Sequence, residues 1–220
     1  MSESGNLTII IQAGGESRRM GRSKATVPFL GEPLLLRGVR CLLPLADEFI
    51  ITTNEPQNLT FLSEWTENGR IRLVTDICDI RGALRGINTA FSAATTEYVA
   101  MIACDMIFPS CRLIEAELKA LIETGCDAAV PHTLYGYEPF HGVYRRKTCL
   151  AAVEAALADG EERAASWFNR ISVREFTPEM IDEIEPRGCC FVNANTPDEL
   201  AAAEQQVMAC LVQEGERVGA

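Results

Sequence analysis

The sequence predicts an α/β fold with a mostly parallel β-sheet, and three observations support this prediction. Short apolar runs of five or six residues alternate with longer stretches of helical pattern. A glycine-rich turn directly follows the first apolar run, and neither an internal repeat nor a low-complexity linker interrupts the chain. Because strands that alternate with helices form βαβ units, we expect one domain built on parallel strands.

The strands predicted in the first part of the chain are residues 7–11, 48–52, 71–75, 98–103 and 127–131. Each is a short, mostly apolar run that is followed by residues typical of loops. Helical patterns connect them near residues 33–43, 82–94 and 110–124. Ser110 follows Pro109 and is predicted to cap the last of these helices, because a serine hydroxyl accepts a hydrogen bond from an unpaired amide at a helix start.

The second part of the chain begins with a turn-rich segment at residues 132–139. A strand at residues 140–145 and a helix at residues 147–158 follow, and a further helical patch ends at Phe168. Late strands are predicted at residues 171–176 and 189–192. The last predicted element is a helix at residues 197–214, with Pro197 in its first turn, where proline is favoured.

The composition limits the class of partner. The chain has 220 residues, of which 47% are hydrophobic and 23% charged, as in an ordinary soluble globular protein. Its net charge of −11 argues against a nucleic-acid-binding protein, which needs a basic face. A small anion held in a local basic pocket is compatible with this charge.

The sequence also predicts a compartment. No apolar run approaches the roughly 20 residues that span a membrane, and the first residues lack the basic and apolar regions of a signal peptide. Nine cysteines without a Cys-x-x-Cys pair fit free thiols in a reducing compartment better than a disulfide framework or a zinc site. We therefore expect a cytoplasmic protein with no membrane or nucleic-acid partner.

The loop after the first strand, residues 12–24, contains three glycines, three arginines and Lys24. A glycine-rich turn between a strand and a helix often binds phosphate through open backbone amides. The Gly-x-Gly-x-x-Gly fingerprint is excluded because the glycines stand at 14, 15 and 21, and the P-loop is excluded because five residues separate Gly15 from Gly21. The alternative is a surface turn with incidental arginines, but crowded cations at a sheet edge favour a bound anion.

Asp105 is the second candidate site residue. It follows the predicted strand at residues 98–103, and the carboxyl ends of parallel strands are where open α/β sheets place ligands. A carboxylate there suits Mg²⁺, which usually binds one or two carboxylates together with substrate phosphates. A turn or capping role is the alternative. The phosphate-type loop at the same sheet edge favours the metal.

With both features in view, the sequence resembles the molybdenum cofactor guanylyltransferases, within the wider group of nucleotidyltransferases. Four motifs carry the resemblance: Gln12-Ala-Gly-Gly15 with Arg19-Met-Gly21 and Lys24; Gly82-Ala-Leu-Arg-Gly86, preceded by Asp76 and Asp79; Cys104-Asp105; and Asn193-Ala-Asn195-Thr-Pro-Asp-Glu-Leu200. The resemblance implies a three-layer α/β/α, Rossmann-like fold of the nucleotide-diphospho-sugar transferase type. It also implies one domain over residues 1–220, with a nucleotide-binding half at about 7–131 and a second-substrate half at about 132–214.

The resemblance also implies roles for individual residues. Lys24, Arg19 and Asp105 are the implied catalytic residues, and Asp105 would hold Mg²⁺. The implied nucleotide-binding residues are Gln12, Ala13, Gly14, Gly15, Lys24, Thr52, Asn54, Asp76 and Asp105. The implied second-substrate residues are Arg19, Gly82, Arg85, Asn193 and Asn195.

Three positions depart from the family pattern. Gln12 replaces an aliphatic residue at the end of the first strand. Ala83 replaces a proline, which loosens a turn that proline would stiffen. Arg85 stands where a small residue is usual, so it either adds a cation for a phosphate or alters the pocket.

The implied reaction transfers GMP from GTP to molybdopterin, or molybdenum cofactor, and releases pyrophosphate. Cofactor-insertion and molybdoenzyme maturation proteins are the expected further partners. A cytidylyltransferase acting on the same pterin is an alternative, although such relatives usually open with Ala-Ala-Gly, whereas this chain has Ala13-Gly14-Gly15. The sequence also leaves open a sugar-phosphate nucleotidyltransferase and a non-catalytic nucleotide-binding protein.

Overall fold

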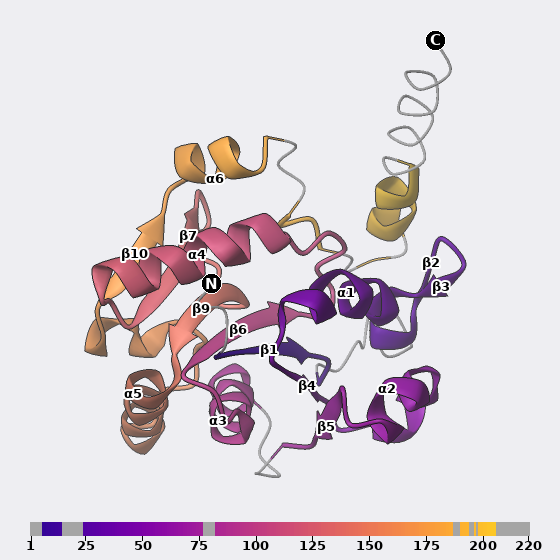
Figure 1. The fold of residues 1–220 in the computed structure, drawn as a ribbon. Coiled ribbons are helices and arrows are strands. Elements are labelled where there is room, and N and C mark those ends of the chain that lie inside the picture. The colour runs from indigo at the N-terminus through magenta and orange to yellow at the C-terminus, as the bar shows by residue number, and fades with distance from the viewer. Residues whose placement is uncertain are drawn as a thin grey trace.

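One β-sheet forms the centre of the fold and is covered by helices on both faces (Figure 1). The structure is a computed structural model, and it describes residues 6–14, 24–76, 82–186, 190–193, 196 and 198–205. The three-layer α/β/α architecture predicted above is confirmed. Among the described residues, no helix is long and apolar enough to cross a membrane.

The strands of the sheet lie in the order β10-β7-β9-β6-β1-β4-β5, and β8 pairs with β7. β9 runs antiparallel to its neighbours β6 and β7, whereas the other neighbours along this order are parallel. A separate hairpin consists of β2 and β3. The strand bounds are β1 Leu7–Gln12, β2 Pro28–Phe29, β3 Glu32–Pro33, β4 Glu48–Thr52, β5 Arg72–Val74, β6 Tyr98–Ala103, β7 Ala128–Thr133, β8 Gly136–Tyr137, β9 His141–Arg145 and β10 Val173–Phe176.

The helices form two layers (Figure 1). On one face lie α1 (Leu34–Leu42), α4 (Cys111–Thr124) and α6 (Pro178–Ile184), and on the other lie α3 (Ala83–Ala93) and α5 (Arg146–Ala158). A short helix, α2 (Ser63–Glu67), precedes β5, and residues 198–205 are also helical. The 3-10 helices are η1 Lys24–Thr26, η2 Leu43–Leu45, η3 Pro56–Leu62 and η4 Ser166–Arg170.

The alternation of side chains along β1 explains why both faces need helices. Ile9 and Ile11 pack into the core on the side of α1 and α4, whereas Ile10 packs into the core on the side of α3 and α5. All three are fully buried, with at most 1% of the surface exposed. Because successive side chains point to opposite faces, a continuous apolar strand requires a cover on each side.

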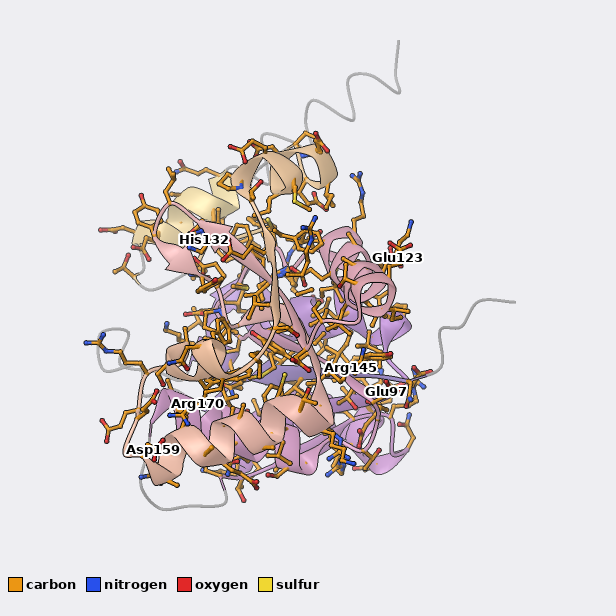
Figure 2. The ribbon with its side chains drawn as sticks, turned by 90° about the vertical axis from the view of Figure 1, so that its left-hand side faces the viewer. Glu97, Glu123, His132, Arg145, Asp159 and Arg170 are labelled. Carbon is orange, nitrogen blue, oxygen red and sulfur yellow. The ribbon has the colours of Figure 1, made fainter. Side chains whose placement is uncertain are left out.

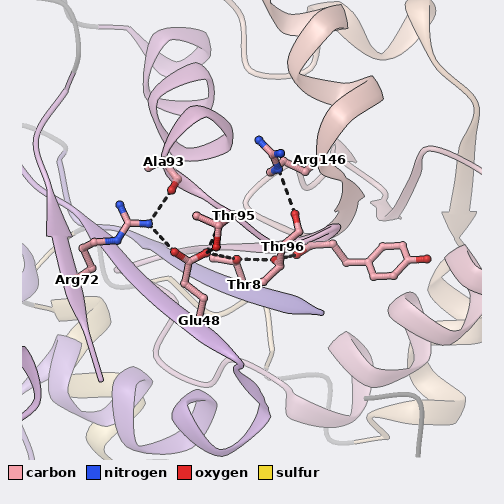
Figure 3. Close-up of polar contacts among 8 residues, drawn as sticks. Thr8, Glu48, Arg72, Ala93, Thr95, Thr96 and Arg146 are labelled. Carbon is pink, nitrogen blue, oxygen red and sulfur yellow. Dashed lines mark hydrogen bonds and ion pairs between the residues drawn. The ribbon is translucent and has the colours of Figure 1, made fainter. Parts of the chain in front are cut away.

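A polar network closes the amino end of the sheet, opposite the carboxyl ends of the parallel strands (Figure 3). The Glu48 carboxylate accepts hydrogen bonds from the Thr8 hydroxyl at 2.7 Å, the Thr95 amide at 2.8 Å and Arg72 Nη2 at 2.5 Å. Partial burial alone would raise the pKa of Glu48, but these hydrogen bonds lower it below its ordinary value. The network therefore ties β1, β4 and β5 together at an edge that is far from the site described below.

Charged side chains on the outer surface form ion pairs at the ends of elements (Figure 2). Arg170 contacts Asp159 at 2.8 Å and Glu161 at 2.7 Å, and Arg145 contacts Glu97 at 2.6 Å. Exposed pairs of this kind contribute little to stability. The two apolar cores on either side of the sheet are therefore the main source of stability.

Most predicted elements are confirmed, with small shifts of their ends. β4 and β6 have the predicted bounds, and the predicted helix at residues 110–124 forms as α4. The strand predicted at residues 189–192 is wrong for its described part, because residues 190–192 are in turn and irregular conformation. This segment is held instead by a backbone bond from the Ile107 amide to the Val192 carbonyl and by a bridge between Met106 and Asn193. Of the predicted final helix, residues 198–205 are described and helical.

Ser110 forms the predicted helix cap, and we expect Ser110→Ala to lower the free energy of unfolding by about 1 kcal/mol. Its hydroxyl accepts from the Leu113 amide at 3.0 Å and donates to Glu185 Oε1 at 2.5 Å, and both bonds are lost in the variant. Urea denaturation would measure the change. Ser92→Ala is the matched control, because Ser92 is exposed within α3, where alanine is the better helix former. Equal midpoints for wild type and Ser110→Ala would contradict the capping role.

Candidate active site

The carboxyl ends of three neighbouring parallel strands meet at one level of the sheet. Gln12 at the end of β1 stands in register with Thr52 at the end of β4 and with Ala103 at the end of β6. A cavity of about 580 Å³ opens there. It is lined by Gln12, Gly14, Lys24, Thr52, Asp76, Gly82, Ala83, Gly86, Ala103, Cys104, Asp105, Met106, Glu138, Phe140 and Asn193. Most of the described residues that the sequence predicts for the site are thus brought together.

Lys24 and Asp105 form an ion pair in this cavity. Lys24 begins η1, just after the glycine-rich loop, and Asp105 follows β6. Lys24 Nζ donates to Asp105 Oδ2 at 2.5 Å, and the two side chains are 22% and 17% exposed. The pair is therefore partly shielded but open to a ligand, and it offers a cation and a carboxylate side by side.

Asn54 and Asp76 form a second polar pair at the ends of β4 and β5. Asn54 Nδ2 donates to Asp76 Oδ2 at 2.7 Å, and the Asp76 amide donates to Asn54 Oδ1 at 3.2 Å. A Cβ built on Gly14 would lie 3.9 Å from Asn54 Nδ2, so the glycine-rich loop starts beside this pair. The three predicted nucleotide-side residues are therefore neighbours.

A backbone hydrogen bond joins Ala13, just after β1, to Thr52 at the end of β4. The Ala13 amide donates to the Thr52 carbonyl at 2.8 Å, and both residues are buried. The Ala13 amide thus already has a partner within the protein. The sheet hydrogen bonding thus continues one residue beyond β1, and the predicted contact of Ala13 with the nucleotide stays a prediction.

The amino end of α3 forms one wall of the cavity. Gly82 precedes the helix, and Gly82, Ala83 and Gly86 line the cavity. A helix amino terminus carries a partial positive charge and suits an anion. Arg85 packs its side-chain carbons near Gly82, at 3.9 Å from a Cβ built there, and is not among the lining residues.

The side chain of Gln12 crosses from β1 toward α3. A Cβ built on Gly86 would lie only 3.3 Å from Gln12 Nε2, so the amide group fills the space that glycine leaves. Gln12 Nε2 is buried and has no hydrogen-bond partner among the residues that the structure describes. The departure from an aliphatic residue at this position therefore places a polar side chain at the cavity wall.

Asn193 reaches the cavity from the late part of the chain. It lines the cavity through the bridge with Met106, and its Oδ1 is buried without a hydrogen-bond partner in the described part of the chain. A buried carbonyl oxygen of this kind can accept a hydrogen bond from a ligand. Gly15, Arg19 and Asn195, which the sequence also assigns to the site, lie outside the described residues, as does Asp79 of the second motif.

Cys104, Glu138 and Phe140 line the cavity but were not predicted as site residues. Burial, with a smaller contribution from Asp105, raises the pKa of the Cys104 thiol to about 12, so this sulfur is not a thiolate nucleophile at neutral pH. Glu138 and Phe140 come from the connection between β8 and β9. The turn-rich pattern of residues 132–139 was the available signal, but it does not show which side chains turn inward.

Comparison with known proteins decides the family. The family described as MobA-like NTP transferase domain matches residues 9–175. A molybdenum cofactor guanylyltransferase from Desulfosudis oleivorans is 33% identical over 207 residues, which cover 92% of this chain and 96% of that protein. The chain belongs to the MobA-like NTP transferase family. The family predicted from the four motifs is thereby confirmed. The chain is a nucleotidyltransferase.

Further relatives of this NTP transferase agree with the assignment. A probable molybdenum cofactor guanylyltransferase from Natranaerobius thermophilus is 28% identical, over 91% of this chain and 96% of the other. The crystal structure of molybdopterin-guanine dinucleotide biosynthesis protein A from Archaeoglobus fulgidus has a TM-score of 0.77 at 24% identity and covers 92% of this chain and 99% of that one. The 4-diphosphocytidyl-2C-methyl-D-erythritol synthase of Anaerococcus prevotii has a TM-score of 0.70 at 16% identity, over 94% and 97% of the two chains. These structures show the shared fold.

A buried acid lies behind the site of this NTP transferase. Glu117 of α4 and His141 of β9 are both fully buried, with His141 Nδ1 3.5 Å from Glu117 Oε1. Burial raises the pKa of Glu117 from 4.5 to about 7, although the nearby His141 favours the charged form. The unfolded chain therefore loses this proton near pH 4.5, whereas the folded protein retains it up to about pH 7.

Stability should consequently fall as pH rises through this window, by up to about 3 kcal/mol from this group. Glu117→Gln keeps the shape but removes the titrating proton, so the variant is expected to gain stability over wild type as pH rises from about 5.5 to about 8. Urea denaturation across this range would measure the difference. Glu123→Gln, an exposed change on the same helix, is the control. A difference between Glu117→Gln and wild type that stays constant with pH would contradict the prediction.

Proposed function

We propose that this chain transfers GMP from GTP to molybdopterin and releases pyrophosphate. The proposal is supported by two relatives, one named molybdenum cofactor guanylyltransferase and the other probable molybdenum cofactor guanylyltransferase. This chain matches each of them over 96% of its length. The observation that carries it is the Lys24–Asp105 pair, in a cavity formed by the carboxyl ends of parallel strands and the amino end of α3. A cation, a carboxylate and a helix amino terminus in one cavity suit the transfer of a phosphate group between two polyanions.

In the proposed reaction, a phosphate of the pterin attacks the α-phosphorus of GTP in line with the leaving pyrophosphate. The attacking phosphate is already an anion, so the reaction needs no general base from the protein. The contribution of the chain is to position two anionic substrates and to offset the negative charge between them. Lys24 would contact the phosphates of the nucleotide, and the first turn of α3 would add its partial positive charge.

The carboxylates in the cavity suit a Mg²⁺ ion that is bound together with the substrate phosphates. Among the described residues, no group of three or more His, Cys, Asp or Glu side chains could hold a metal ion by itself. The carboxylates of Asp105 and Asp76 nevertheless line the same cavity, and Mg²⁺ usually binds one or two carboxylates together with substrate phosphates. We propose that Asp105 would hold it, and the bound ion would supply charge neutralisation at the phosphates.

The two substrates would occupy different sides of the cavity. We assign the nucleotide to the side of Gly14, Asn54 and Asp76, where a polar pair can meet the base or the ribose. The pterin is assigned to the side of Gly82 and Asn193, and the Asn193 Oδ1 supports this by offering a buried acceptor. We further propose a cytoplasmic location and transfer of the product to cofactor-insertion or molybdoenzyme maturation proteins. Nine cysteines without a Cys-x-x-Cys pair support this location.

Pyrophosphate release tests the proposed function. The purified protein would be incubated with molybdopterin, Mg²⁺ and GTP, CTP or ATP, and a parallel thermal-shift series would measure binding of each nucleotide. Release with GTP, together with the largest thermal shift for GTP, is the expected result. Release with CTP alone would indicate a cytidylyltransferase. A thermal shift without release would indicate a nucleotide-binding protein that does not catalyse the transfer.

A further inference from the structure

Two cysteine thiols from different parts of the chain contact each other on the outer side of the α1 and α4 layer. Cys41 lies in the last turn of α1, and Cys111 is the first residue of α4. Their sulfur atoms are 3.3 Å apart, although 70 residues separate them in the sequence. Cys41 is exposed and Cys111 is half-buried, so the pair is accessible to small molecules.

The surroundings make the two sulfurs unequal. A hydrogen bond from Cys111 and the nearby Arg37 guanidinium outweigh partial burial and a Glu185 carboxylate, and they lower the pKa of Cys41 to about 7. The same hydrogen bond and burial raise the pKa of Cys111 well above its ordinary value. The directions of the two shifts make Cys41 the thiol of the pair that loses its proton more readily.

Cys41 also opens onto a cavity separate from the active site. This second cavity has a volume of about 450 Å³. Arg37 lines it near the sulfur, and Arg40 lines it in an ion pair with Glu32, at 2.5 Å. Arg37 is held there by a hydrogen bond to the Ile107 carbonyl and by the ring of Phe108, 5.3 Å from its guanidinium carbon. An exposed thiol beside an arginine is typical of reactive cysteines rather than of inert core thiols.

We propose that Cys41 and Cys111 form an oxidation site at which a peroxide converts the two thiols to a disulfide that joins α1 to α4. The Cys41 thiolate attacks one peroxide oxygen, so that an S–O bond forms and the O–O bond breaks; the leaving hydroxide becomes water with the proton that the Cys41 thiol released to solvent. The Cys111 sulfur then attacks the Cys41 sulfur; the S–S bond forms, the S–O bond breaks, and the leaving hydroxide takes the proton of Cys111 as a second water. Two sulfurs are oxidised and one peroxide is reduced.

The position of the pair gives this bond a structural consequence. A disulfide has a sulfur–sulfur distance of about 2.0 Å, so the two sulfur atoms, now 3.3 Å apart, would have to move closer together. α1 follows the segment that begins with Lys24, and α4 follows the loop that carries Asp105. The disulfide would therefore fasten together the two segments that lead away from the charged pair of the active site.

Peroxide treatment followed by peptide mapping tests the proposal. The reduced protein would be treated with a few equivalents of hydrogen peroxide, alkylated, digested without reductant and analysed by mass spectrometry. The expected result is a linked peptide pair that contains Cys41 and Cys111, two hydrogens lighter than the reduced pair, and a loss of two titratable thiols per chain. Linkage of Cys41 to another cysteine, or only between chains, would overturn the proposal.

Two variants separate the roles of the sulfurs. Cys111→Ser leaves a hydroxyl that can still donate to Cys41, so dimedone is expected to trap a sulfenic acid at Cys41 in this variant. Cys41→Ser is expected to give neither the adduct nor the linked peptides. Cys126→Ser, at a half-buried thiol that contacts the Ala128 carbonyl, should oxidise like wild type. Oxidation of Cys126 at a lower peroxide dose than Cys41 would also overturn the proposal.

Discussion

Asp105→Asn is expected to lower the turnover of GTP and molybdopterin by about 100-fold or more, the size of effect seen when one preorganised electrostatic contact is removed from an active site. The substitution keeps the shape of the side chain and removes its charge. In the structure that charge balances Lys24 at 2.5 Å and faces the cavity. In the proposed function it would also hold Mg²⁺ against the phosphates. Pyrophosphate release at saturating substrates measures the effect.

The controls for Asp105→Asn separate chemistry from folding. Asp105 is at the surface of the cavity rather than in either apolar core, so the circular dichroism spectrum and thermal midpoint should stay close to those of wild type. Asp182→Asn makes the same chemical change at an exposed position on α6 and should keep full activity. If a well-folded Asp105→Asn protein works within a few-fold of wild type, the proposed role of this carboxylate is wrong.

The layers of the fold could be predicted because their signals are local. The run at residues 98–103 is apolar at every position, as is typical of a short strand buried on both faces, and β6 forms with these bounds. Ser110 could be identified as a cap for the same reason, since a cap depends on its own residue and the next turn. β9 is predicted as a strand without a stated direction, and the structure shows β8 and β9 both antiparallel to β7 after a short turn at residues 134–135.

Only the site residues at the carboxyl ends of strands could be placed together from local sequence patterns. Asp105 and Thr52 lie where two apolar runs stop, so their place at one sheet edge follows from the parallel arrangement. Glu138 and Phe140 reach the same cavity from a turn whose path no short pattern encodes. The contact between Gln12 and Gly86 was likewise hidden, because it joins two elements that are 74 positions apart in the sequence. Long-range contacts of this kind depend on the tertiary fold rather than on local sequence.

Lys24→Met is expected to raise the GTP concentration needed for half-maximal turnover by about 10-fold or more and to lower the maximal rate as well. Methionine keeps much of the length and packing of the side chain but carries no charge. The Lys24 side chain is only 22% exposed. Water therefore screens its attraction to an anion less than it would at a fully exposed position. In the proposed function this charge meets the phosphates of the nucleotide both before and during transfer, so binding and rate are expected to fall together.

Comparison with two further variants makes the Lys24 prediction specific. Lys24→Arg retains the positive charge and should recover part of the GTP affinity, although its planar group has a different geometry. Lys119→Met removes a lysine that is 74% exposed on α4 and should behave like wild type. Because Lys24 and Asp105 contact each other, the double variant with Asp105→Asn is expected to lose less than the sum of the two single losses in free energy. A GTP titration of Lys24→Met that overlays that of wild type would contradict the phosphate contact, whereas strict additivity in the double variant would show that the two groups act independently.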